Sequence, residues 1–153
     1  MIEKQELVEG IRFAGRRAAS ALETVQEWDY QLGHQWTTAD AFRHVAGAAG
    51  QLEGFYPMLD GDVLTKQTVD EYATINDQGI EGLGDKSRDE VRQMILDGAE
   101  ESAKYAETLD QEDLDQVITL GGYHMSKGEI VAQIWIHHQI AHSYEASGRW
   151  PIQ

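Results

Sequence analysis

Apolar residues recur every three or four positions along four long stretches of the chain, which is the spacing of one face of an α-helix. The first stretch runs from Leu7 to Trp28 and the second from Phe42 to Tyr56. The third runs from Val91 to Leu109, and the last continues to Ser147 near the end of the chain. Four amphipathic helices around one core indicate an all-α chain folded as an antiparallel four-helix bundle.

The last three of these stretches are preceded by a hydroxyl residue that is followed, three positions later, by an acidic residue. This is the spacing of a capping box, in which two side chains satisfy the free backbone N–H groups at a helix start. In chain order the pairs are Thr37 with Asp40, Ser87 with Glu90, and Ser126 with Glu129. We therefore expect a helix to begin directly after the hydroxyl residue of each pair.

The segments between the helices are less regular. Residues 57–86 form a long connection in which "VDEYATIND" is expected to make a short helix, and a connection of this length is often a lid or a wall of a site. "VITLGGYHM" predicts two short extended pieces around Gly121 and Gly122, which is a β-hairpin.

The length of 153 residues suits one domain, so residues 1–153 are expected to form a single unit with one core. The net charge of −15 opposes binding to nucleic acid and to anionic membranes. No apolar run is long enough to span a bilayer, and the polar start "MIEKQELVEG" does not resemble a signal peptide, so the cytoplasm is the expected compartment.

The chain has no cysteine. Disulfides, thiolate nucleophiles and cysteine-based zinc sites are therefore excluded. Any metal must be held by His, Asp or Glu, and any thiol chemistry requires a thiol supplied from outside.

Histidines are concentrated in "IWIHHQIAH" on the last predicted helix. His138 and His142 are four positions apart and so share one helix face, where both rings can reach one metal ion. This face is expected to continue the apolar stripe through Ala141 toward the core. His137 lies about 100° round the helix and is not expected to be a ligand. Gln139 stands where a zinc protease motif requires glutamate, which excludes that class.

His44 on the second predicted helix is the candidate third ligand. It lies beside the apolar stripe, and Ala41 and Ala48 leave room next to its ring. Facing helices of a bundle readily join ligands in this way. The residues alone leave a second interpretation open, in which His44 is a hydrogen-bonded and partly buried histidine without a metal.

Several other polar residues lie near the candidate site in the sequence. Glu145 can be read as a fourth ligand, as a group that orients His142, or as a charge at the end of the helix. The candidate groups for handling protons are Tyr144, Glu145, Tyr123 and His124, whereas His34 and His124 are expected at the surface or outside the ligand shell. Asp40 is expected to serve as the capping residue.

Two of these stretches resemble a known family. "WTTADAFRHVAG" is similar to the second-helix signature of the DinB/YfiT-like proteins, and "SKGEIVAQIWIHHQIAHSYEASGRWP" is similar to their last helix. The third helix, "SRDEVRQMILDGAEESAKYAETLDQEDL", matches in position. The resemblance covers nearly the whole chain.

The resemblance implies a four-helix bundle in up-down-down-up order with a divalent metal at one end. The implied ligands are His44, His138 and His142, and the usual metals are nickel and zinc. Relatives of this type include mycothiol-dependent isomerases and bacillithiol- or mycothiol-dependent S-transferases, in which the metal activates a low-molecular-weight thiol. Homodimers are common among them.

Three functions follow as alternatives. The first is a metal-dependent enzyme, a thiol S-transferase or a hydrolase, acting on a small-molecule substrate with an external thiol or water. The second is a non-catalytic, stress-associated protein in which a structural metal ties two helices together. The third is a bundle whose histidines are vestigial and hold no metal. A fourth protein ligand such as Glu145 would close the metal shell and exclude the first alternative.

Overall fold

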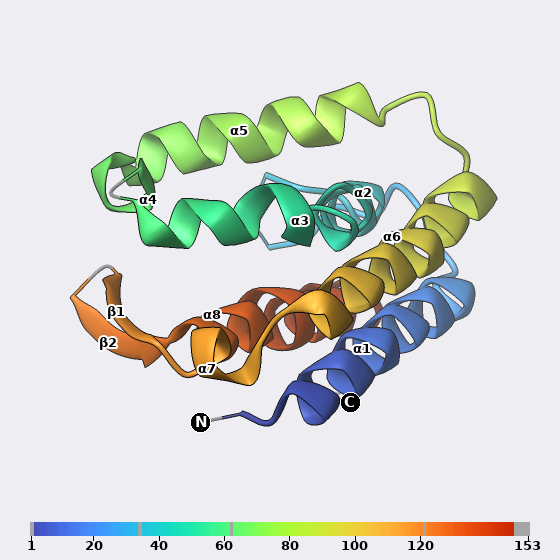
Figure 1. The fold of residues 1–153 in the computed structure, drawn as a ribbon. Helices are drawn as coiled ribbons and strands as arrows, with labels where there is room; N and C mark the ends of the chain where they lie inside the picture. The colour runs from blue at the N-terminus through green and yellow to red at the C-terminus, as the bar shows by residue number, and fades with distance from the viewer. Residues whose placement is uncertain (1, 34, 62, 121, 149–153) are drawn as a thin grey trace.

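A computed structural model describes residues 2–33, 35–61, 63–120 and 122–148 of the chain, and these residues are mostly helical (Figure 1). The separate long helices are α1 (Lys4–Thr24), α2 (Thr38–Ala49), α5 (Val69–Gly82) and α6 (Arg88–Thr108). A further long helical segment consists of α8 (Lys127–Ala132), η2 (Gln133–His138) and α9 (Gln139–Ser147). The short elements are α3 (Leu52–Phe55), η1 (Tyr56–Asp60), α4 (Val63–Lys66), α7 (Gln111–Leu114), β1 (Val117–Leu120) and β2 (Tyr123–Ser126). The prediction of an all-α chain is confirmed.

The helix starts lie where the hydroxyl and acidic pairs predict them. Complete capping boxes precede α2, α6 and α8, with both reciprocal hydrogen bonds present in each. Thr68 and Glu71 form one more capping box at the start of α5. The predicted short helix at "VDEYATIND" is therefore confirmed, and it continues to Gly82 to give 14 residues in all.

Two predicted helices end earlier than the apolar pattern suggests. The first ends at Thr24, and Trp28 lies beyond it, where its ring stacks on Phe42 with the centroids 6.1 Å apart. The second is interrupted after Ala49, whose carbonyl oxygen accepts hydrogen bonds from Ser102 Oγ at 2.6 Å and from Trp135 Nε1 at 3.1 Å. Because side chains of α6 and η2 donate hydrogen bonds to this carbonyl, it is not available to continue the helix, and α2 ends where it meets these two elements.

The long helices pack against one another in pairs. α1 contacts α6 and α9, and α2 contacts the same two elements. Gly98 of α6 lies so close to the end of α2 that a Cβ atom there would be 2.7 Å from the backbone nitrogen of Gly50. In Figure 1, α5 forms an outer layer over α2 and α3, and its one buried residue is Ile80.

The predicted hairpin is confirmed. β1 and β2 pair antiparallel, with Val117 opposite Ser126 and Leu120 opposite Tyr123. Gly122 in the turn has a φ of 84°, a conformation that suits glycine. Gly121 lies outside the described residues.

Candidate metal centre

His138 and His142 lie on the last helical segment, at the edge of its buried face. The predicted stripe is wrong beyond Ile134, because Ala141 is exposed whereas Gln139 and Ser143 are buried. The reason is the π-helical turn η2, which inserts one extra residue into the helix and shifts the buried face by one position. The two histidines are therefore half-buried beside the core and face the neighbouring helix α2.

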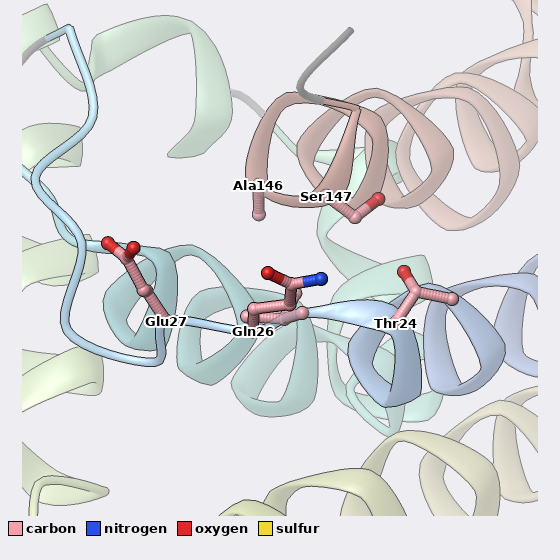
Figure 2. Close-up of a pocket in the computed structure, with 6 residues that line it drawn as sticks. Thr24, Gln26, Glu27, Ala146 and Ser147 are labelled. Carbon is pink, nitrogen blue, oxygen red and sulfur yellow. The ribbon is translucent and has the colours of Figure 1, made fainter. Parts of the chain in front are cut away.

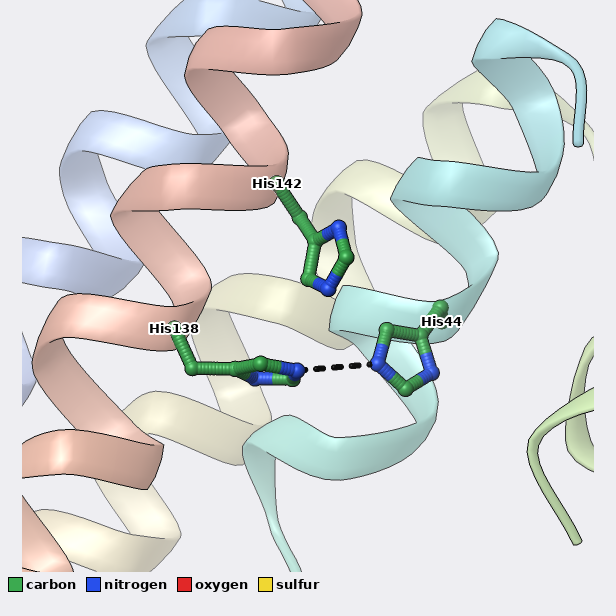
Figure 3. Close-up of side chains that lie close together, drawn as sticks. All are labelled: His44, His138 and His142. Atoms are coloured by element: carbon green, nitrogen blue, oxygen red, sulfur yellow. Dashed lines mark hydrogen bonds between the residues drawn. The ribbon is translucent and has the colours of Figure 1, made fainter. Parts of the chain in front are cut away.

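His44 extends from α2 toward these two rings, as Figure 3 shows. Its Nε2 atom is 3.2 Å from Nε2 of His138. One nitrogen from each of the three rings lies within 4.8 Å of the others. In the described part of the chain, no other group of three or more His, Asp or Glu side chains meets the same test. The structure thus brings together the three histidines that the sequence singled out.

The ring nitrogens are spaced as ligands of one ion require. Metal–nitrogen bonds of about 2.0–2.1 Å at a tetrahedral ion place two ligand atoms roughly 3.3 Å apart. The 3.2 Å between the Nε2 atoms of His44 and His138 matches this spacing. The same distance also suits an N–H···N hydrogen bond between two neutral imidazoles, so the geometry fits a metal ion and does not require one.

Burial keeps two of the rings neutral. Loss of solvation, followed by repulsion from His138 and His142, lowers the pKa of His44 from 6.5 to about 4. Loss of solvation and repulsion from His142 lower the pKa of His138 to about 4, while the backbone carbonyl of Ile134 opposes the fall. Both rings are therefore neutral at pH 7, which is the protonation state that a metal ligand needs.

The outer nitrogens of the three rings differ in their surroundings. Nδ1 of His142 is 3.2 Å from a carboxylate oxygen of Glu145, so its Nε2 is left for the centre of the cluster. Nδ1 of His138 is buried and has no hydrogen-bond partner in the described part of the chain. The backbone carbonyl of Ile134 nevertheless raises the pKa of this ring. Nδ1 of His44 points away from His138 in Figure 3.

Glu145 resolves one alternative left open by the sequence. Its carboxylate contacts the outer nitrogen of His142 and is not part of the cluster of ligand atoms. This is the position of a carboxylate that orients a metal-binding histidine. In the described residues, the group that could hold a metal ion therefore consists of the three histidines alone.

The remaining candidates in the described residues are not members of this group of three ligand side chains. His137 is exposed and contacts Gln133, and His124 is exposed on β2, where it contacts Thr119. Tyr123 and Tyr144 are also exposed, and Tyr123 lies on the hairpin. Asp40 serves as the capping residue of α2, as predicted. His34 lies outside the described residues.

Trp36 belongs to the site although the sequence analysis did not assign it there. Its ring centroid lies 5.0 Å from that of His44 and 5.7 Å from that of His142. Its Nε1 donates a hydrogen bond to Asp77 of α5 at 3.1 Å. The sequence could have indicated this position, because Trp36 directly precedes the capping box of α2 and an apolar side chain there packs back against the first turns of the helix.

A cavity of about 320 Å³ adjoins the cluster between α2 and α5. It is lined by His44 and by four residues of α5, including Asn76 and Gly79. Residues of α5, within the 57–86 segment, thus form one wall of this cavity, and the cavity reaches the cluster through His44 alone. Another cavity, of about 220 Å³ and lined by Glu27 and Ser147 among others, contains none of the three histidines (Figure 2).

No helix in the described ranges combines the length and the apolar character that crossing a bilayer requires. Neither the family models nor the curated proteins with which the sequence was compared match it.

Proposed function

We propose that this chain is a metal-dependent enzyme of the DinB/YfiT-like type. His44, His138 and His142 hold one nickel or zinc ion, and the reaction is the transfer of an external low-molecular-weight thiol to a small-molecule substrate, or hydrolysis by water. The observation that carries the proposal is the meeting of these three side chains, two of them with lowered pKa values, from helices far apart in the sequence.

The fold we propose is a four-helix bundle of α1, α2 with α3, α6, and α8 with α9, in up-down-down-up order. The contacts of α1 and of α2 with both α6 and α9 support it. In this arrangement α5 is an addition to the bundle that forms one wall beside the metal site.

A divalent ion held by three neutral imidazoles keeps its full charge, and this charge lowers the pKa of a thiol or water that reaches it. The residues of the chain supply the rest. Glu145 holds the orientation of His142, and Trp36 covers the rings of His44 and His142 on one side. Because the chain has no cysteine, the reacting thiol comes from a cosubstrate.

The alternative is a structural metal that ties α2 to α9. Structural zinc sites are closed by four protein ligands, whereas catalytic sites keep a position open. The contact of Glu145 with the outer nitrogen of His142 favours the open site. The homodimer implied by the family resemblance stays a prediction, which sedimentation of the purified chain would test.

The test is the metal content of the purified, untagged chain by mass spectrometry, with the variants His138→Ala and His137→Ala. His137 is the matched control, because it is the neighbouring histidine, is exposed and is not part of the cluster. We expect about one nickel or zinc per chain, retained by His137→Ala and lost by His138→Ala. Absence of metal from the wild type, even after nickel or zinc is added, would exclude the proposal.

A second step separates the enzyme from the structural alternative. A thiol added to the metal-loaded chain should shift the ultraviolet absorption of a nickel-substituted sample, because thiolate binding to nickel produces charge-transfer bands. A metal-loaded chain whose spectrum is unchanged by excess thiol and by changes in pH would instead hold its metal for structure.

A further inference from the structure

The outer side of the His44 ring faces a cavity, and this sets His44 apart from the other two histidines. Metal-binding histidines almost always donate the N–H of their second nitrogen to a carboxylate, a backbone carbonyl or water. Glu145 takes this role for His142, whereas Nδ1 of His138 is buried and the backbone carbonyl of Ile134 raises the pKa of that ring. Within the described residues, Nδ1 of His44 has no hydrogen-bond partner, and His44 lines the cavity of about 320 Å³ between α2 and α5.

Four polar side chains line this cavity, and they come from Arg43, His44, Gln51 and Asn76. Arg43 lines it next to His44, and its Nε is buried without a partner in the described part of the chain. The guanidinium group makes a hydrogen bond of 2.9 Å to the carbonyl of Gly84 and a long contact of 3.5 Å to Asp40. The guanidinium has five N–H donors in all, so one N–H on each terminal nitrogen remains for a ligand, whereas the Nε–H is buried.

The rest of the cavity wall suits a small molecule with an apolar part. The side-chain amides of Gln51 and Asn76 line it and have no hydrogen-bond partner among the described residues. Ile75 and Ile80 of α5 supply apolar surface. A carboxylate forms charge-assisted hydrogen bonds with a guanidinium group, and these are roughly twice as strong as hydrogen bonds between neutral groups.

We propose that the cavity between α2 and α5 binds a small carboxylate-bearing molecule, whose oxygens accept hydrogen bonds from Nδ1–H of His44 and from the guanidinium group of Arg43. The inference rests on the proposed function, because a metal on Nε2 fixes the proton of His44 on Nδ1. The carboxylate then takes the role for His44 that Glu145 has for His142. Metal and carboxylate therefore strengthen each other's binding, as thermodynamic linkage requires.

The test compares benzoate with benzamide, which have nearly the same shape and differ in charge. Both are titrated into the zinc-loaded full chain and followed by calorimetry and by amide chemical shifts in the NMR spectrum. We expect benzoate to bind at least about tenfold more tightly than benzamide, as a hydrogen bond to a charged group predicts. The shifts should concentrate at Arg43, Gln51, Asn76 and Gly79. The variant Arg43→Gln should bring the affinities for the two compounds close together.

A second pair of variants covers the case in which Arg43→Gln does not fold. Gly79 lines both this cavity and the neighbouring one, whereas Gly82 lines the neighbouring one alone. A Cβ atom at either glycine would meet nothing within 4 Å, so a larger side chain fits both positions. Leucine also favours the helix over glycine at either position. Gly79→Leu should lose benzoate binding, and Gly82→Leu should keep it.

The outcomes separate this inference from the proposed function, because zinc content is measured on the same samples. A wild type that binds zinc and shows equal affinity for benzoate and benzamide, or binds neither, would overturn the carboxylate site alone. Benzoate binding unaffected by Gly79→Leu would do the same. A wild type that binds no zinc would overturn the proposed function, and the linked site with it.

Discussion

The ammonium group of Lys127 is the most deeply buried charge among the described residues, since the side chain is 1% exposed. It lies 2.6 Å from Oδ1 of Asp60 and 2.9 Å from Oδ1 of Asp113. The hydroxyl of Tyr56 donates a hydrogen bond of 2.6 Å to the other oxygen of Asp113. This network joins η1, α7 and α8, at residues distinct from the histidine cluster.

The two carboxylates make a matched pair for mutation. Asp113→Ala removes the less exposed partner, which is 34% exposed, and leaves both Lys127 and Tyr56 without it. Breaking a buried ion pair costs about 3–5 kcal/mol. Because Asp60 stays within reach of Lys127, we expect a loss of about 2–3 kcal/mol in the free energy of unfolding. Asp60→Ala removes a carboxylate that is 65% exposed, and should cost about 1 kcal/mol or less.

The assay is urea denaturation at pH 7, followed by circular dichroism at 222 nm, with both variants beside the wild type. The slope of the free energy against urea concentration should be unchanged, so the difference appears in the midpoint. Equal losses in the two variants, or a larger loss in Asp60→Ala, would show that burial of the partner does not set the strength of this network.

Three further predictions concern the site and the helix packing. Since the pKa values of His44 and His138 are about 4 in the folded chain, below the ordinary histidine value of 6.5 that unfolding restores, the metal-free protein should lose stability as the pH falls from about 6.5 to about 4. Guanidinium titrations at pH 7 and pH 5 should show a larger loss of unfolding free energy for the wild type than for His44→Gln. Equal losses would contradict the lowered pKa of His44. Glu145→Gln should weaken metal binding about 10- to 100-fold, measured by competition with a chelator, and an unchanged affinity would remove its orienting role. Gly98→Ala should destabilise the chain by about 1–3 kcal/mol, because a Cβ atom there overlaps the end of α2. Gly79→Ala is the control and should not destabilise the chain, because a Cβ atom there meets nothing within 4 Å. Thermal unfolding should therefore show a lower midpoint for Gly98→Ala only.

The helices and their starts could be predicted because both depend on local pattern. Apolar spacing and the capping pairs, such as Ser126 with Glu129, are read along a few neighbouring residues. The meeting of His138 and His142 is local in the same sense, since four positions make one helical turn. His44 could be added because a small residue stands one turn before it and another one turn after it, on a helix expected to face the last one.

The features that the sequence did not show depend on contacts between distant segments. The π-helical turn η2 lies where Ile136 approaches Gly10 of α1, and nothing in residues 133–138 alone indicates the extra residue. The end of α2 at Ala49 depends on hydrogen bonds from two other segments. The cavity beside His44 exists because α5 lies over α2, and the position of α5 cannot be read from its own pattern, in which Ile80 is the one buried residue.

The proposed site is tested most directly by the X-ray absorption spectrum of the chain loaded with one equivalent of zinc, recorded before and after addition of a small thiol. We expect three imidazole nitrogens at about 2.0–2.1 Å and one lighter ligand that sulfur replaces at about 2.3 Å when the thiol is present. A shell with fewer than three imidazoles, or a fourth protein ligand that the thiol leaves in place, would contradict an open metal site formed by His44, His138 and His142.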